Sequence, residues 1–330
     1  MTASPRLRLR VVIPVFNDWE SLSILMRALD RIAASLDCEL IVSVIDDGST
    51  QPDDVFRQAA AELEFIEQLE LVQLAVNVGH QRAIAIGLCR AADSADSDAV
   101  LVMDSDGEDP PESIPALLER AQGQREFCIV ARRRRRSESL AFKASYVIYR
   151  SVFRLVTGKE IRFGNFSLIS SGNVRRLTMI PDLWNNLAAA VLRSRIPLLQ
   201  VPIDRGKRYA GRSKMNFTSL IVHGFSAISV YADTIFVRLL LITVVMTCLT
   251  VPAVALVLSL RLFVPAHATP GWATTVSFGL IIIVLQALFT TLTSILALLN
   301  SRVQRLMLPI VDYKPYVRDV EVLISSRSIA

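Results

Sequence analysis

The first part of the chain alternates short apolar runs with segments in which apolar residues recur at helical spacing. The runs cover residues 11–15, 39–45, 69–75, 99–103 and 127–131. A short apolar run bounded by polar turns is typical of a buried strand, whereas apolar residues three and four positions apart indicate one face of a helix. Strands that alternate with helices predict an α/β domain with a doubly wound, mostly parallel, right-handed sheet.

Apolar residues recur at helical spacing between these apolar runs and predict four helices, at residues 22–36, 53–67, 83–91 and 114–122. Beyond them, residues 163–168 are expected to form a tight turn that enters an edge strand. Residues 184–192 predict a short helix and residues 197–203 a further strand. Residues 139–156 mix apolar and basic side chains, which is typical of a helix lying in a membrane interface. The apolar residues of 217–231 predict a second interfacial helix that leads into the C-terminal apolar runs. Ordinary helix packing remains the alternative for residues 139–156.

Two long runs near the C-terminus contain no charged residue. They cover residues 239–260 and 271–300, and the link between them contains Pro265 and Pro270. A helix needs about 20 apolar residues to cross the roughly 30 Å of a bilayer's hydrocarbon core. Two buried core helices would not need uncharged runs of this length, so the sequence predicts a transmembrane hairpin.

Basic residues flank this hairpin on both sides, while its connecting loop holds only Arg261 and His267. The positive-inside tendency therefore predicts that both termini are cytoplasmic. The apolar run at residues 11–16 is too short for a signal peptide, so none is expected.

The overall composition agrees with a membrane protein. Hydrophobic residues make up 52% of the chain, and the mean hydropathy of +0.42 is high for a soluble enzyme. The net charge of +5 could suit nucleic acid, but no recognition motif accompanies it. Anionic lipid is the simpler partner beside a membrane anchor, so no nucleic-acid binding is expected.

Several common kinds of site are not supported by the sequence. The four cysteines and three histidines lie far apart, which indicates neither a zinc site nor a disulfide framework. No G-x-G-x-x-G or G-x-x-x-x-G-K motif is present, so neither the dinucleotide nor the P-loop mode of phosphate binding is indicated.

The apolar run at residues 99–103 ends in two carboxylates one residue apart, Asp104 and Asp106. Ligands of open α/β sheets bind beyond the carboxyl ends of the strands. Carboxylate oxygens at such a place suit Mg²⁺ or Mn²⁺, with diphosphate oxygens completing the coordination shell. The alternative is an acidic loop that precedes a helix, since Pro110 and Pro111 are good first residues of a helix.

Two basic segments are candidates for binding anions. Residues 205–214 read R-G-K-R-Y-A-G-R-S-K, in which glycine permits close backbone approach while arginine and lysine neutralise phosphate. A flexible basic linker is the alternative. Residues 132–136 are five consecutive arginines, which suit either a solvated loop or a contact with anionic headgroups or phosphate.

Five motifs in this order resemble those of a known family. They are P-V-F-N-D at 14–18, D-D-G-S at 46–49, N-V-G-H-Q-R-A at 77–83, D-S-D-G-E-D-P-P-E at 104–112 and R-x-x-G-R-S-K at 208–214. Together they resemble the inverting family 2 glycosyltransferases. More narrowly, they resemble the membrane branch related to dolichol-phosphate mannosyltransferase and bacterial polyprenyl-phosphate glycosyltransferases. The likeness covers roughly residues 9–300 and implies a glycosyltransferase A fold, which is Rossmann-like, and a nucleotide-sugar donor.

The resemblance also implies roles for individual residues. Those near the donor would be Pro14, Phe16, Asp46, Asp47, Asn77, Gly79, Arg82 and Asp104. Asp104 and Asp106 would hold the metal, and Arg208, Arg212 and Lys214 would meet the acceptor phosphate.

The chain departs from the family at Asn165, where relatives commonly carry an aspartate that is a candidate catalytic base. An asparagine cannot take a proton. A phosphate monoester, whose second pKa is about 6, needs no base because it is largely ionised at neutral pH. A hydroxyl acceptor would want general-base help. Asn165 therefore favours a phosphate acceptor, or else another carboxylate such as Asp109 serves as the base.

The resemblance and the hairpin together predict a membrane-anchored, metal-dependent transferase that moves a sugar from a nucleotide sugar to a polyprenyl phosphate at the cytoplasmic face. The rivals are a transferase acting on a glycolipid or polysaccharide hydroxyl and a non-catalytic sugar-nucleotide binder. A homo-oligomer is left open. The expected division is a catalytic domain (1–212), an interfacial helix (213–232), a hairpin (233–301, with helices at about 238–260 and 272–300) and a cytoplasmic tail (302–330).

Overall fold

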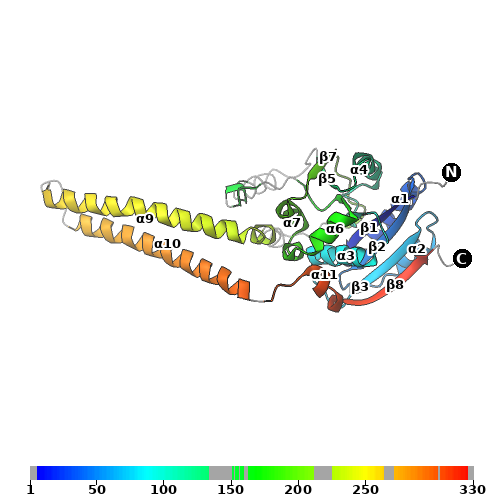
Figure 1. Cartoon of the computed structure of the whole chain (residues 1–330). Helices are drawn as coiled ribbons and strands as arrows, with labels where there is room; N and C mark the ends of the chain where they lie inside the picture. Colours follow the sequence, from blue (N-terminus) through cyan, green and yellow to red (C-terminus); the bar gives the residue numbers. More distant parts are fainter. Residues whose placement is uncertain are drawn as a thin grey trace. The chain divides into compact units, whose positions relative to one another are not determined.

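The computed structural model describes residues 6–133, 151, 153–155, 157–159, 163–211, 225–263, 271–303 and 305–325. The chain forms two compact units (Figure 1). One comprises Met1–Val147, Glu160–Val230 and Met307–Ala330, and the other comprises Ile148–Lys159 and Tyr231–Leu306. We call them the sheet unit and the hairpin unit.

The sheet unit is built on eight strands in the order β7-β5-β6-β4-β1-β2-β3-β8. Their bounds are β1 (Leu7–Val15), β2 (Cys38–Asp46), β3 (Gln68–Leu74), β4 (Ala99–Val102), β5 (Cys128–Arg133), β6 (Ser167–Ser170), β7 (Leu198–Ile203) and β8 (Val317–Ser325). Strand β1 runs parallel to β2 and β4, β2 to β3, and β5 to β7, whereas β6 and β8 are antiparallel to their neighbours. The predicted α/β fold with a mostly parallel sheet is confirmed.

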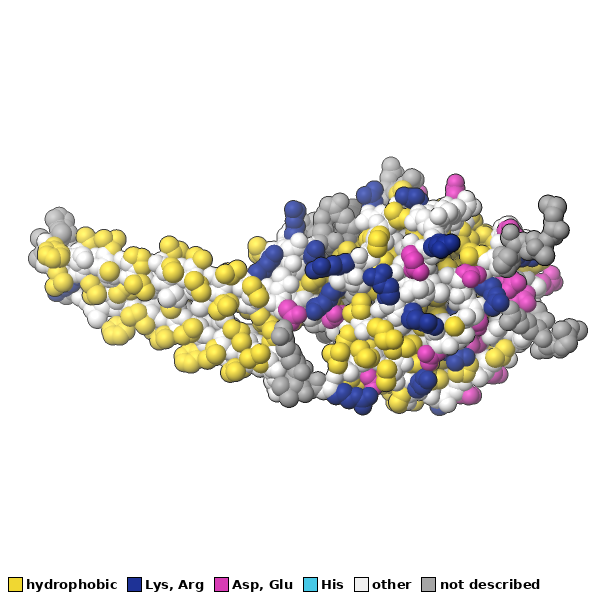
Figure 2. Space-filling view, viewed as in Figure 1, with side chains coloured by type: hydrophobic (Ala, Val, Ile, Leu, Met, Phe, Trp, Pro, Cys, Tyr) yellow, Lys and Arg dark blue, Asp and Glu magenta, His cyan; other side chains and the backbone are white. Residues whose placement is uncertain are grey.

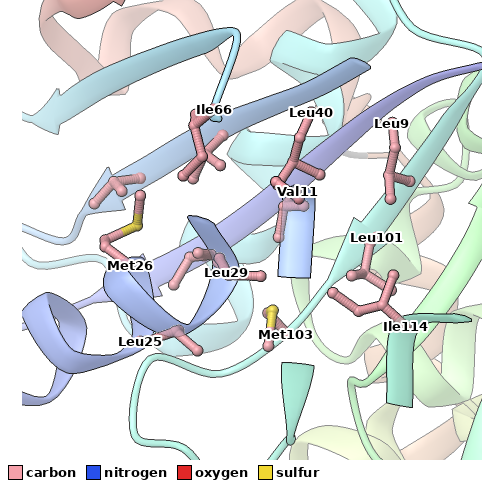
Figure 3. Close-up of a cluster of buried hydrophobic side chains, with 14 of the residues drawn as sticks. Leu9, Val11, Leu25, Met26, Leu29, Leu40, Ile66, Leu101, Met103 and Ile114 are labelled. Atoms are coloured by element: carbon pink, nitrogen blue, oxygen red, sulfur yellow. The ribbon is translucent and has the colours of Figure 1, made fainter. Parts of the chain in front are cut away.

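Helices cover both faces of this sheet. They are α1 (Trp19–Ala33), α2 (Asp54–Ala61), α3 (His80–Ser94), α4 (Ile114–Ala121), α6 (Ser171–Thr178), α7 (Leu187–Ser194) and α11 (Pro309–Asp312), with short 3₁₀ turns at Pro111–Ser113, Pro181–Trp184 and Lys314–Tyr316. Strand β1 is buried on both sides, since Leu9 and Val11 join one core while Val12 joins the other. In the first core, Leu25 and Leu29 of α1 lie over the strands (Figure 3). Burial on both faces explains why the strands read as continuous apolar runs.

The expectation of an edge strand after residue 163 is wrong. Strand β6 lies inside the sheet, antiparallel to β4 on one side and β5 on the other. Its terminal serines are buried but hydrogen-bonded, because Ser167 Oγ donates to the Asn165 carbonyl at 2.8 Å and Ser170 Oγ donates to Glu126 Oε2 at 2.8 Å. Because both serine hydroxyls make hydrogen bonds, a short strand with polar residues at its two ends can lie in the interior of the sheet.

The segment after the hairpin returns to the sheet. Strand β8 pairs antiparallel with β3 as the edge strand. Arg57 of α2 makes two hydrogen bonds to Glu321 of β8, at 2.7 and 2.8 Å, and Tyr313 donates to Asp93 at 2.8 Å. The segment expected to form only a cytoplasmic tail therefore completes the sheet, so both ends of the hairpin connect to the same folded unit.

The hairpin unit contains α9 (Ala232–Phe263) and α10 (Trp272–Val303), both long and apolar enough to cross a membrane. Their most apolar windows have mean hydropathies of 2.5 and 2.3, and only 6% of each window is buried. Such exposure does not fit the core helices of a soluble protein. Figure 2 shows hydrophobic side chains along this surface, with charged side chains gathered on the sheet unit. Thr243 and Thr291 join the two helices through a 2.7 Å hydroxyl contact.

Candidate active site

The loops that follow β1, β2, β3 and β4 meet at one edge of the sheet, because these parallel strands end there together. Asn17 ties the first two loops. Its Oδ1 accepts from the backbone N–H groups of Thr50 and Gln51, both at 2.9 Å. Its own backbone N–H donates to Ser49 Oγ at 2.8 Å. Asn17 has a φ of +49°, a left-handed conformation that asparagine tolerates.

The predicted donor residues Asp46 and Asp47 hold the second and third loops. Asp47 is buried, and its two carboxylate oxygens accept from Val78 N–H at 2.7 Å and Gly79 N–H at 3.0 Å. Burial raises the pKa of Asp47, while these two hydrogen bonds act to lower it. Asp46 Oδ1 accepts from Ser49 N–H at 2.9 Å. The two aspartates therefore shape the loops, and their contact with a nucleoside stays a prediction.

Gly48 permits these loops to approach each other. A Cβ at this position would lie 2.7 Å from the backbone nitrogen of Asn77, and Gly48 has a φ of +70°. Only glycine fits such a close backbone approach at a positive φ. The other predicted donor residues fall around this edge: Pro14 is buried in β1, Phe16, Asn77 and Arg82 are exposed, and Gly79 is partly exposed at a φ of +91°.

The two candidate metal ligands follow β4. Asp104 Oδ1 lies 3.2 Å from His80 Nε2, and the backbone N–H of Asp104 donates to Asp109 Oδ2 at 3.1 Å. Asp106 Oδ1 accepts from the Glu108 N–H at 3.0 Å, and its Oδ2 accepts from Arg208 at 2.8 Å. Burial raises the pKa of Asp106, and the charges of Asp104 and Glu108 add to that effect.

The described residues contain no group of three His, Cys, Asp or Glu side chains arranged to hold a metal. Mg²⁺ is commonly bound by one or two carboxylates together with substrate phosphates and water, so a pair can suffice. Asp104 and Asp106 supply hard oxygen donors, and the like charges that raise the pKa of Asp106 would be relieved by a divalent cation. The residues present therefore fit Mg²⁺ or Mn²⁺ held jointly with a diphosphate.

Asp109 is placed to support Asp104. It is buried, and it borders a cavity of about 10 Å³ that is also lined by Gly164 and Phe166. Such a cavity is about the size of a single water. In this arrangement the carboxylate holds the Asp104 backbone, and its assignment as an alternative base stays a prediction.

A chain of side-chain amides fixes the orientation of Asn165. The Leu187 backbone N–H donates to Gln81 Oε1 at 2.9 Å, so Gln81 must present its NH₂ group to Asn165 Oδ1, which lies at 3.0 Å. Asn165 Nδ2 then lies 3.0 Å from His80 Nε2 and 3.5 Å from Asp104 Oδ1. Asn165 therefore presents a hydrogen-bond donor, not a base, toward the candidate metal ligand.

His80 and Gln81 were absent from the residues predicted for the site, although both stand in the 77–83 motif. Their place in the first turn of α3, directly after a strand-end loop, is the signal that could have identified them. Burial acts to lower the pKa of His80, but the charges of Asp104, Asp47 and Asp106 raise it above its usual value.

The basic loop after β7 packs against the acidic loop after β4. The Gly206 N–H donates to the Glu108 carbonyl and the Tyr209 N–H to the Asp106 carbonyl, both at 2.9 Å. The Tyr209 ring covers Gly107, where a Cβ would lie 2.5 Å from the ring. Arg205 forms an ion pair with Glu108. The structure thus brings Arg208 to the metal-ligand candidates, while Arg212 and Lys214 lie outside the described residues.

This fold and this site define a glycosyltransferase of the A fold. The family described as glycosyl transferase family 2 matches residues 10–178, which is more than half of the chain, and the protein belongs to that family. The predicted family and enzyme class are confirmed.

Two curated relatives carry the name undecaprenyl-phosphate 4-deoxy-4-formamido-L-arabinose transferase. The one from Klebsiella pneumoniae (strain 342) is 29% identical over 300 residues, covering 88% of this chain and 80% of the relative. The one from Erwinia tasmaniensis is 29% identical over 278 residues, covering 81% of each chain. The likeness therefore extends well beyond the family match, into the C-terminal part of the chain.

Solved structures resemble this chain in fold. Mannosyl-3-phosphoglycerate synthase from Rubrobacter xylanophilus has a TM-score of 0.52 at 15% identity, covering 69% of this chain and 73% of that one. Glucosyl-3-phosphoglycerate synthase from Mycobacterium tuberculosis, in complex with Mn²⁺, UDP-glucose and phosphoglyceric acid, has a TM-score of 0.51 at 16% identity, covering 70% and 80%. At these identities the likeness shows the fold alone.

Proposed function

We propose that this protein transfers a sugar from a nucleotide-sugar donor to the phosphate of a polyprenyl phosphate. The observation that carries the proposal is the direct packing of the basic loop at residues 204–211 against the carboxylates that follow β4. One side of the site then suits a diphosphate with its cation, and the other suits an acceptor phosphate. The names of the curated relatives support the same acceptor.

The donor would lie across the loops that follow β1 to β4. Pro14, Phe16, Asp46 and Asp47 would hold the nucleoside, with Asn77, Gly79 and Arg82 nearby. Asp104 and Asp106 would hold Mg²⁺ or Mn²⁺, which when bound stabilises the leaving nucleoside diphosphate.

The acceptor phosphate would supply the nucleophile. A phosphate oxygen forms the new bond to the anomeric carbon while the bond from that carbon to the diphosphate breaks. Because a phosphate monoester with its second pKa of about 6 is largely ionised at neutral pH, no side chain has to remove a proton. Asn165 suits this chemistry, since its amide orients groups near Asp104 without acting as a base. Arg208, with Arg212 and Lys214, would neutralise the phosphate.

The hairpin would hold the enzyme in the membrane, where a polyprenyl phosphate resides. Two helices long and apolar enough to span a bilayer support this location. The chain leaves the sheet unit and returns to it through β8, which supports a hairpin with both ends on one side of the membrane. The basic flanks support a cytoplasmic location for that side.

The test is to incubate membranes that contain the protein with a panel of labelled nucleotide sugars and added polyprenyl phosphate. We expect one sugar to enter the lipid fraction only when the polyprenyl phosphate is present. Membranes that lack the protein are the control. Label that appears only on a glycolipid or polysaccharide, or no label with any donor, would contradict the proposal.

A further inference from the structure

Arg208 is shared between two acidic loops. Its Nη2 lies 2.6 Å from Asp18 Oδ2, in the loop after β1, and its Nη1 lies 2.8 Å from Asp106 Oδ2, in the loop after β4. Its Nε donates to the Ala210 carbonyl at 3.0 Å. All three guanidinium nitrogens are therefore engaged, two of them with carboxylates from the loops that follow two different strands.

The Asp106 carboxylate is engaged at both oxygens. Oδ1 accepts from the Glu108 N–H at 3.0 Å and Oδ2 accepts from Arg208. A divalent cation on Asp106 would need these oxygens and would repel the guanidinium beside them. Arg208 and a cation therefore compete for the same carboxylate.

We propose that Asp18 is a positioning residue that keeps Arg208 at the site when a divalent cation takes Asp106. The side of the guanidinium that leaves Asp106 then receives a phosphate oxygen of the acceptor. This inference rests on the proposed function and adds to it a coupling between the donor side and the acceptor side. Because coupling is reciprocal, the bound cation strengthens acceptor binding and the acceptor strengthens cation binding.

The basic loop does not depend on the pair between Arg208 and Asp106. Two backbone hydrogen bonds join Gly206 and Tyr209 to the acidic loop, and Arg205 pairs with Glu108. The loop can therefore stay in place while one ion pair is exchanged. Arg205 also provides a matched control, since it carries the same charge on the same loop but does not pair with Asp106.

The first experiment measures Mn²⁺ binding alone. The full-length protein in nanodiscs of zwitterionic lipid is titrated with Mn²⁺, and the free ion is followed by electron paramagnetic resonance. We expect Arg208→Ala to tighten Mn²⁺ binding roughly three- to fivefold, because the change removes a guanidinium that competes for Asp106 through a partly exposed ion pair. Arg205→Ala should change binding by less than about twofold, on the same scale. Asp106→Ala should abolish it, which locates the ion.

The second experiment tests Asp18 by a double-mutant cycle. In the wild-type background, Asp18→Asn should weaken Mn²⁺ binding at least about twofold, because Arg208 then pairs with Asp106 alone. In the Arg208→Ala background, the same change should have no effect. A merely structural or long-range electrostatic role of Asp18 would weaken binding equally in both backgrounds. Asp18→Asn should also raise the KM for polyprenyl phosphate more than it lowers kcat.

Each outcome bears on a different claim. Equal effects of Arg208→Ala and Arg205→Ala, or an Asp18→Asn effect that persists without Arg208, would overturn the exchange and leave the proposed function standing. A wild-type protein that binds no Mn²⁺ alone would overturn the exchange, and one that binds no Mn²⁺ even with a nucleoside diphosphate present would also overturn the metal in the proposed function.

Discussion

Gln81 donates its side-chain amide to Asn165, with 3.0 Å between Nε2 and Oδ1. This contact turns the NH₂ group of Asn165 toward Asp104. The asparagine that stands where family members commonly carry an aspartate is therefore held as a hydrogen-bond donor by its neighbours.

The first prediction follows from that contact. Asn165→Asp should give no gain in transfer to polyprenyl phosphate, and a several-fold loss is expected because a second carboxylate then faces Asp104 and the anionic acceptor. Initial rates at saturating donor provide the measurement. If a side-chain base were missing, restoring it would raise the rate by roughly 10²–10⁴-fold, and such a gain would count against a phosphate acceptor.

Gln81→Leu tests the amide chain itself. Without the Gln81 donor, Asn165 is free to turn, and we expect kcat to fall by about tenfold, a loss of about 1.4 kcal/mol of transition-state stabilisation. Gln124→Leu, in the turn between α4 and the start of β5, is the control, since among the described residues its amide donates to the Arg120 carbonyl alone. Unchanged kcat in Gln81→Leu would show that the orientation of Asn165 does not matter.

The metal is tested by removing either the ion or its ligand. Asp106→Ala should lower transfer by at least about 10²-fold, because the charge of the leaving diphosphate loses its compensation. EDTA should have the same effect, with recovery on adding Mg²⁺ or Mn²⁺. Asp54→Asn, on the exposed side of α2, serves as the matched carboxylate control. Full turnover in EDTA would refute the metal assignment.

A buried network of ion pairs among Arg10, Glu70 and Arg90 should govern the stability of the sheet unit at acid pH. Glu70 Oε1 lies 2.6 Å from Arg10 Nη1, and Oε2 lies 2.7 Å from Arg90 Nη2. Burial acts to raise the pKa of Glu70, but the contacts with Arg90, Arg10 and Ser43 hold it below its usual value. A lowered folded-state pKa gives stability that is present above the unfolded-state pKa, near 4.3, and is lost as the pH falls through the folded-state pKa.

We therefore expect Glu70→Gln to destabilise the sheet unit at pH 7 by about 1.5–3 kcal/mol, since it removes one of the two carboxylates that pair with the buried Arg10, while Asp96 remains. The variant should also lose less stability than wild type as the pH falls below 4.3. Urea unfolding followed by tryptophan fluorescence measures both effects. Glu321→Gln, which breaks a more exposed pair with Arg57, should cost only about 0–1 kcal/mol. Equal losses in the two variants would contradict the role of burial.

Topology is open to cysteine labelling in a cysteine-free background. A probe at Ala268, between the two apolar helices, should react with an impermeant reagent from outside the cell. A probe at Ser325, at the end of β8, should react only after the membrane is opened. The reverse pattern would contradict the cytoplasmic location of the sheet unit.

Local patterns in the sequence predicted much of the fold and part of the site. Apolar runs and their turns predicted the parallel strands, and parallel strands that end together place Asp46 and Asp104 at one edge. The strand predictions succeed because each depends on neighbouring residues or on a general rule of sheet geometry. The basic loop was predicted as an anion site from its composition; the structure puts its Arg208 beside Asp106, and the anion site itself stays a prediction.

What the sequence did not reveal depends on long-range pairing. Asp18 and Arg208 are 190 positions apart, and no local pattern joins them. Strand β8 carries a short alternation at Val320, Val322 and Ile324, but its partner β3 lies on the other side of the hairpin in the sequence. Likewise, the interior position of β6 is decided by which strands it pairs with, which its four residues do not specify.

The linkage in the product tests the central claim most directly. The labelled lipid formed by the wild-type protein is treated with mild acid, and the release of sugar is followed over time. A sugar joined to a phosphate through its anomeric carbon is acid-labile, so we predict rapid release, with no labelled lipid formed by Asp106→Ala. A labelled lipid that withstands mild acid would be a glycoside on a hydroxyl, and it would contradict transfer to a polyprenyl phosphate.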